Sequence, residues 1–112
     1  MTAEPTAPGE GEEHPVLRLE DTIHQRTRLG ILAILSETTR ADFAYLRGAL
    51  GLTDGNLSRH LSVLDEAGLV TVTKVFEGRR PRTWIRATKK GTAALERELH
   101  ALRDLLDRLD RT

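Results

Sequence analysis

The chain has 112 residues, 38% of them hydrophobic and 30% charged, which fits a single globular domain with a modest core. It contains no cysteine, which excludes disulfides, thiol redox sensing and thiolate metal sites and makes a cytoplasmic location the expectation. No apolar run is long enough for a transmembrane helix, and the N-terminus is unlike a signal peptide, so we expect no membrane partner.

The formal net charge is zero, but the charges are unevenly distributed along the chain. Residues 1–21 carry six acids and one base, whereas residues 22–91 carry twelve bases and six acids. Seven of those bases lie within residues 74–90. Because the local field matters more than the total charge for docking on phosphate, the middle of the chain is suited to a polyanion.

The first fifteen residues contain four glutamates, three of the four prolines and few apolar side chains, which predicts a disordered acidic tail. The first helical region is then expected over residues 16–37, where the apolar side chains are dense enough for the centre of a domain. His24 in this region is interpreted as a packed or dimer-facing residue rather than a ligand.

A short helix is predicted to end near Leu50, with Asp42 as its N-cap, because apolar residues recur at helical spacing between them. Tyr45 in this helix is assigned to packing at the edge of the core, with a phosphate contact through its hydroxyl as the alternative. The turn at residues 51–53 then leads into a third helix, so these two helices form a helix–turn–helix.

The third helix, predicted over residues 53–67, is amphipathic. Thr53 is the expected N-cap, since its hydroxyl can accept a backbone N–H, and Gly68 supplies the C-terminal stop. An apolar stripe at helical spacing should face the core, which leaves polar side chains free to read a ligand. The stripe consists of Leu57, Leu61 and Leu64, and the polar residues include Asn56, Ser58, Arg59 and His60.

A β-hairpin is predicted next, from a β-branched strand at residues 69–76, a turn at 77–81 and a returning strand at 82–87. The single tryptophan, Trp84, is interpreted as packing on a neighbouring helix, and the alternative is a position near the bound polyanion. Three arginines surround Pro81 at the tip, which favours a functional basic turn over an ordinary solvated one. They are Arg79, Arg80 and Arg82.

The last helix should begin after its N-cap, Thr88, and run to about Asp110. Its leucines recur at spacings of four and three residues, which is typical of a coiled-coil seam and predicts a homodimer. The alternative is a helix that folds back on its own domain. The seam consists of Leu95, Leu99, Leu102, Leu106 and Leu109.

Three segments resemble the MarR and ArsR groups of bacterial transcriptional regulators, and the likeness spans roughly residues 19–110. They read TRLGILAIL at 27–35, LTDGNLSRHLSVLDEAGLV at 52–70 and FEGRRPRTWIRATKKG at 76–91. The resemblance implies an α+β winged helix-turn-helix, with a three-helix core and a β-hairpin wing. The DNA-binding domain is then expected over residues 16–91, and a C-terminal dimerisation helix over residues 92–112.

The expected function is transcription regulation by a homodimer on duplex DNA, which is not an enzyme activity. The helix at 53–67 should enter the major groove, where arginine suits guanine and asparagine suits adenine. The wing at 74–86 should contact the backbone or minor groove. The residues assigned are Arg59 and Asn56 to base edges, Thr53, Ser58 and His60 to phosphates or edges, and Lys74, Arg79, Arg80 and Arg82 to the wing contacts.

Other functions leave weaker signals. The sequence lacks a Gly-rich phosphate loop and a zinc-protease motif, and we expect no cofactor. His100 and Asp104 share a helix face, but this pair alone is a poor metal signature. Two alternatives stay open: a winged helix that binds protein instead of DNA, and a regulator that responds to a metal or an unspecified small molecule near the dimer interface.

Overall fold

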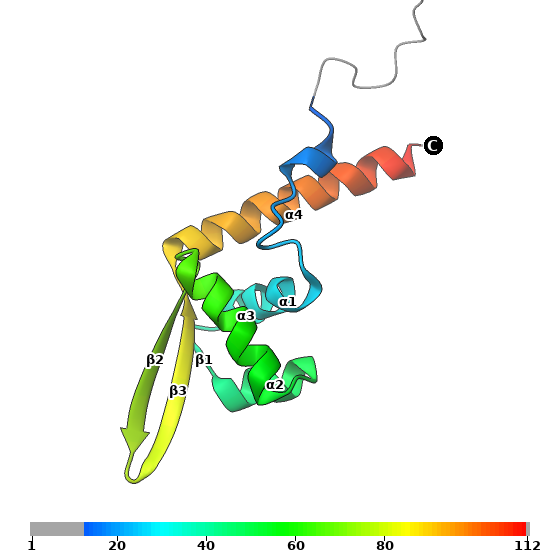
Figure 1. Ribbon diagram of the computed structural model, residues 1–112. Coiled ribbons are helices and arrows are strands. Elements are labelled where there is room, and N and C mark those ends of the chain that lie inside the picture. The colour runs from blue at the N-terminus through cyan, green and yellow to red at the C-terminus, as the bar shows by residue number, and fades with distance from the viewer. Residues whose placement is uncertain (1–12, 112) are drawn as a thin grey trace, which may run out of the picture.

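The computed structural model describes residues 13–111 and contains the predicted winged helix-turn-helix. Three helices lie beside the base of a three-stranded antiparallel sheet of order β1-β3-β2, and a long helix leads away from it (Figure 1). No helix within residues 13–111 is long and apolar enough to cross a membrane. The elements are η1 (Pro15–Arg18), α1 (Arg26–Ser36), β1 (Ala41–Asp42), α2 (Phe43–Leu50), α3 (Asp54–Glu66), β2 (Val70–Glu77), β3 (Arg80–Ala87) and α4 (Lys89–Asp110).

The core lies where α1, α2 and α3 meet the base of the sheet. The predicted stripe of α3 is buried, with Leu57 and Leu64 fully inaccessible. It packs in one cluster with Ile31 of α1, Leu46 of α2 and Ile85 of β3, all of them inaccessible. Burial of a leucine side chain contributes about 1.5–3 kcal/mol, so this stripe fixes which side of α3 faces solvent.

The predicted helix caps are confirmed. The hydroxyl of Thr53 accepts the N–H of Asn56 at 3.1 Å, and the carboxylate of Asp42 accepts the N–H of Tyr45 at 2.7 Å. Thr88 caps α4 in the same way by accepting the N–H of Gly91. Each cap satisfies a backbone donor that a helix leaves free in its first turn.

The hairpin is longer and tighter than predicted. Its turn contains only Gly78 and Arg79, and Gly78 has a φ of 66°, as the first central position of a type II′ turn requires. Pro81, expected in the turn, instead pairs with Phe76 within the ladder. Proline is tolerated there because β1 pairs with β3 only at residues 84 and 85. Near the tip, β3 is therefore an edge strand, and the N–H that proline lacks is not needed for a second ladder.

The N-terminal region differs from the single helical region predicted over residues 16–37. A 3₁₀ turn, η1, is followed by an irregular segment at 19–25, and α1 begins only at Arg26. The chain bends there because it runs from η1 on α4 to the core, where Ile23 is fully buried. Of the predicted acidic tail, residues 1–12 lie outside the described residues, whereas Pro15 is buried in η1.

The start of α4 is pressed against the backbone where α3 passes into β2. The N–H of Thr88 donates to the carbonyl of Leu69 at 3.1 Å, and its hydroxyl donates to the carbonyl of Gly68 at 2.7 Å. Gly91 lies so close to Leu69 that an added Cβ would stand 2.0 Å from that same carbonyl oxygen. Glycine at this position therefore allows the contact between α4 and the domain.

We predict that Gly91→Ala destabilises the protein by roughly 1–3 kcal/mol, because the new methyl group forces α4 away from Leu69. Gly48→Ala is the matched control, since an added Cβ there meets no described atom within 4 Å. That helical change should stabilise by about 0.5–1 kcal/mol. Urea denaturation followed by circular dichroism measures both, and equal stability of the Gly91 variant and the wild type would contradict the close contact.

Candidate nucleic-acid interface

The solvent side of α3 carries the polar residues that the sequence assigned to base contacts. Asn56, Ser58 and Arg59 are exposed, on the side away from the buried leucines. The guanidinium of Arg59 donates to the side-chain oxygen of Asn56 at 2.7 Å. This bond joins the two candidate base readers, one turn apart, into a single polar group and orients the guanidinium along the helix.

The beginning of α3 is held by an ion pair that the sequence did not suggest. Arg47 of α2 donates to the carboxylate of Asp54 at 2.6 Å, next to the cap Thr53. The pair links the two helices across their turn, and Asp54 also suits the positive end of the helix dipole.

His60 lies at the edge of the core stripe and is half-buried. Its Nδ1 atom is buried and has no hydrogen-bond partner among the described residues. Burial, and then the nearby charges of Arg28 and Arg59, lower the pKa of His60 below its ordinary value of 6.5. The ring is therefore neutral at physiological pH, so it brings no positive charge to a phosphate.

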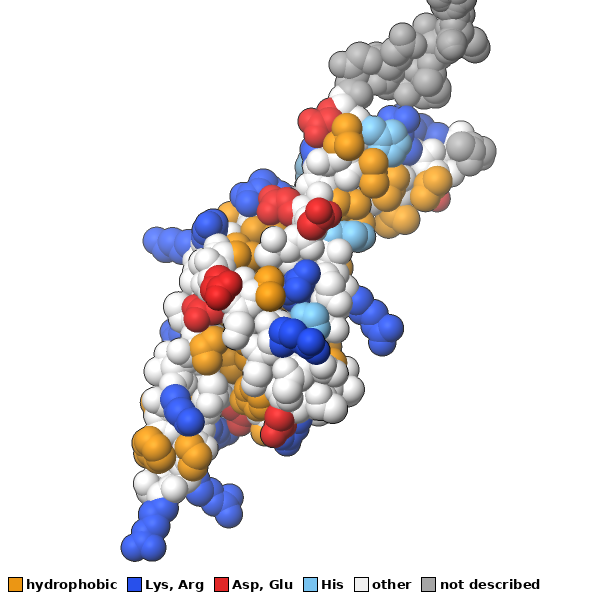
Figure 2. Space-filling view, viewed as in Figure 1, with side chains coloured by type: hydrophobic (Ala, Val, Ile, Leu, Met, Phe, Trp, Pro, Cys, Tyr) orange, Lys and Arg blue, Asp and Glu red, His pale blue; other side chains and the backbone are white. Residues whose placement is uncertain are grey.

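The wing presents three exposed basic side chains of the predicted set. Lys74 lies in β2, and Arg79 and Arg80 lie at the tip, where blue side chains project from its lower end in Figure 2. Within residues 13–111, these three have no acidic partner within ion-pair distance. Their charges are therefore available to an external anion.

Arg82, the fourth predicted wing contact, is held within the molecule. Its guanidinium donates to the Asp42 carboxylate at 2.9 and 3.1 Å and to the Glu77 carboxylate at 3.0 Å. The backbone N–H of Tyr45, helped by Arg82, lowers the pKa of the Asp42 carboxyl below its ordinary value. Asp42 therefore stays ionised at neutral pH, and it joins the wing to the N-terminus of α2.

Trp84 lies beneath the same arginine. The guanidinium carbon of Arg82 is 4.4 Å from the centroid of the indole, and that of Arg40, just before β1, is 3.7 Å from it. Such cation–π contacts favour a fixed guanidinium over a mobile one. The sequence predicts that Trp84 packs on a helix, whereas these two arginines lie over its ring. Tyr45, assigned to the core edge, is 60% exposed near this cluster.

Comparison with known proteins agrees with this geometry. A family model described as a winged helix DNA-binding domain matches residues 27–106. The chain belongs to this winged helix family. A relative from Methanocaldococcus jannaschii, itself uncharacterised, is 38% identical over 78 residues, which are 70% of this chain and 85% of the relative.

One solved structure supports a regulator, and a second shares the fold. A transcriptional regulator homologue from Pyrococcus horikoshii is 37% identical, with a TM-score of 0.75, and the match covers 80% of this chain and 88% of that one. The transcriptional regulator MOSR from Mycobacterium tuberculosis, solved in complex with DNA, is 24% identical, with a TM-score of 0.66 and coverage of 88% and 70%. The winged-helix regulator predicted from the sequence is thus confirmed.

The predicted leucine seam of α4 divides into two parts in the winged helix protein. Leu95 belongs to the core of its own domain, which corrects its assignment to a dimer seam, because α4 packs on α1 near its start. Leu102 is half-buried, and Leu99, Leu106 and Leu109 are 36, 58 and 61% exposed. An apolar stripe therefore continues along α4 beyond the domain and remains largely exposed within the described part of the chain.

The other side of α4 is tied to the N-terminal segment. The fully buried carboxylate of Glu98 accepts the backbone N–H of Glu20 at 3.2 Å and lies 2.7 Å from Nδ1 of His24. Arg18 pairs with Asp104, one residue of the pair considered for a metal. Residues 13–111 contain no group of three or more potential ligands that could hold a metal ion.

We predict that Arg82→Ala exposes Trp84 to collisional quenching by acrylamide, because a guanidinium that covers the ring is removed. Trp84 is the only tryptophan, so the fluorescence reports on this site alone. Arg80→Ala removes an equivalent charge two residues away in the same strand and should leave the quenching constant unchanged. Equal quenching of the Arg82 variant and the wild type would show that Arg82 does not hold this position in solution.

Proposed function

We propose that this protein regulates transcription as a homodimer that binds duplex DNA. In each protomer, α3 enters the major groove, and the wing contacts the backbone or the minor groove. Arg59 and Asn56 read the edges of DNA bases, and Thr53 and Ser58 contact phosphates or base edges. The exposed lysine and arginine side chains of the wing neutralise phosphates. His60 supports the edge of α3 as a neutral ring.

The observation that carries this proposal is the division of α3 into two sides. Its apolar side is fully committed to the core, whereas the opposite side displays Asn56, Ser58 and Arg59 to solvent. A helix of this kind, presented on a rigid domain, is the form in which proteins insert donors and acceptors into the major groove. The exposed basic side chains of the wing, on the hairpin that follows α3, supply attraction to phosphate that does not depend on sequence.

The DNA complex of MOSR supports the same use of the fold, since that protein shares this architecture. The exposed stripe of α4 supports the homodimer. A single chain leaves much of Leu99, Leu106 and Leu109 exposed to water, and a second copy offers the same stripe for burial. Two protomers joined there would present two α3 helices to two half-sites on DNA.

We predict that Arg59→Ala weakens binding to the preferred duplex by roughly 1–3 kcal/mol and relaxes the choice of base at one position. In vitro selection from a random pool first supplies the preferred duplex, and titrations then compare it with a scrambled one. Arg103→Ala, which removes the same charge from an exposed position on α4, is the control and should bind like the wild type.

The wing should behave differently from α3 in the same titrations. Arg79→Ala with Arg80→Ala should weaken binding to both duplexes alike and flatten the salt dependence by about 0.9 log units for each phosphate that is no longer neutralised. Equal weakening on both duplexes for Arg59→Ala, with reduced discrimination for the wing variant, would invert the two roles. Unchanged binding in every variant, or no binding by the wild type, would favour a protein-interaction module.

We predict that the wild type sediments as a dimer at micromolar concentration and that Leu102→Glu with Leu106→Glu sediments as a monomer. The reason is that four unpaired carboxylates would enter the seam of the dimer, where they cannot be solvated. Arg103→Glu adds an acid outside the leucine stripe and should remain dimeric. A monomeric wild type, or a dimeric double variant, would exclude α4 as the dimer seam.

A further inference from the structure

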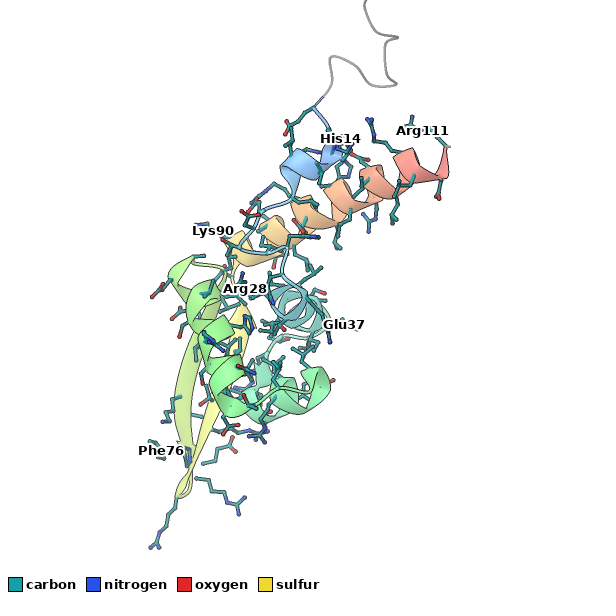
Figure 3. The ribbon with its side chains drawn as sticks, turned by 45° about the vertical axis from the view of Figure 1, so that its right-hand side comes forward. His14, Arg28, Glu37, Phe76, Lys90 and Arg111 are labelled. Atoms are coloured by element: carbon teal, nitrogen blue, oxygen red, sulfur yellow. The ribbon has the colours of Figure 1, made fainter. Side chains whose placement is uncertain are left out.

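An exposed apolar residue stands near the end of the wing. The ring of Phe76 is 70% exposed, and its partner across the hairpin is Pro81, which is exposed as well. Figure 3 labels Phe76 at the far end of the hairpin, well away from α1 and α4. The ring therefore adds nothing to the domain's own core and is accessible to an external partner.

The direction of this ring follows from strand alternation. Val70, Val72, Lys74 and Phe76 share one face of β2, since successive side chains point to opposite sides. Val70 is fully buried beneath the helices at the base of the sheet, so this is the face that α3 packs against. Towards the tip the same face leaves the helices behind, so Phe76 faces solvent.

The charges around Phe76 indicate what occupies that space. Lys74 lies on the same face of β2, and Arg79 and Arg80 follow at the turn, all three exposed. Figure 2 shows orange side chains at the end of the wing with blue ones around them. A protein surface would have to be strongly acidic to meet this set, whereas the minor groove of DNA combines phosphates at its walls with apolar sugar and base surfaces inside.

We propose that Phe76 is a wedge that enters the minor groove of duplex DNA and partly unstacks one base step. This inference rests on the proposed function and adds a second mode of recognition to it, the deformability of the DNA beside the site read by α3. The arginines at the tip hold the groove walls while Phe76, opposite Pro81, replaces part of the stacking surface of the step. Flexible pyrimidine–purine steps should be preferred at this position, because they unstack most easily.

The experiment measures affinity and DNA bending together. The selected duplex carries a fluorescent donor and acceptor at its two ends, so that a kink changes the energy transfer. Phe76→Ala should bind roughly tenfold more weakly, or about 1.4 kcal/mol, and should lose most of the change in energy transfer. The salt dependence should stay that of the wild type, because no charge has been removed. Phe76→Trp keeps a large apolar ring and should retain the bend.

Leu17→Ala is the matched control, since Leu17 is also 70% exposed but lies on η1, beside α4. It should bind and bend DNA like the wild type, and thermal melting verifies that each variant is folded. Wild-type binding without any bend, or a Phe76→Ala variant that bends DNA fully, would overturn the wedge while leaving the proposed function intact. Absence of wild-type binding to any duplex would instead overturn the proposed function itself.

Discussion

The burial of the leucine stripe of α3 is the constraint on which the rest of this structure depends. Leu57, Leu61 and Leu64 meet α1, α2 and β3 in one cluster, so α3 cannot rotate about its axis without opening the core. The identity of the outward residues is thereby fixed by the inward ones. Polar side chains on the far side need only be exposed, and they can change without a cost in packing. In this fold, the buried leucines hold α3 in place, and a separate set of polar side chains on α3 is exposed for binding.

The wing shows a similar division between structural and exposed residues, here among its arginines. Arg82 is bound to two carboxylates and lies over Trp84, whereas Arg79 and Arg80 extend freely from the turn. A two-stranded ribbon alone is a weak structure in water. Its position relative to α3 is held by the link from Arg82 to Asp42, a residue that also caps α2. One carboxylate thus couples the orientation of the ribbon to the start of the helix–turn–helix.

Much of the fold could be predicted from the sequence because its signals are local. The stripe of α3, the caps Asp42, Thr53 and Thr88, and the alternation of the hairpin each depend on residues a few positions apart. The strand β1 has only two residues and carries no periodicity that could reveal it. The bend at residues 19–25 also escaped prediction, because it depends on distant partners, the core around Ile23 and the carboxylate of Glu98.

The candidate site was predictable in its residue types but not in their partners. The density of arginine at the wing indicated a basic surface, yet nothing local distinguishes Arg82 from its neighbours. That difference arises because antiparallel pairing brings Trp84 opposite Asp42, which lies far earlier in the chain. Similarly, Leu95 continues the spacing of the α4 leucines, but its place next to α1 commits it to the core. Long-range register decides these roles, and a single sequence does not display it.

The close approach of Gly91 to Leu69 has a mechanical consequence. Because no side chain separates Gly91 from the backbone of Leu69, α4 cannot shift relative to the domain without a steric clash. The helix and the domain must therefore move together as one rigid body. The 22 residues of α4 make a rigid lever arm about 33 Å long. If two copies join along their outer leucines, a change of about 10° in their crossing angle would alter the separation of the two domains by roughly 6 Å, nearly two base-pair steps. The distance between the two reading helices would then be set at the far end of α4, well away from the DNA.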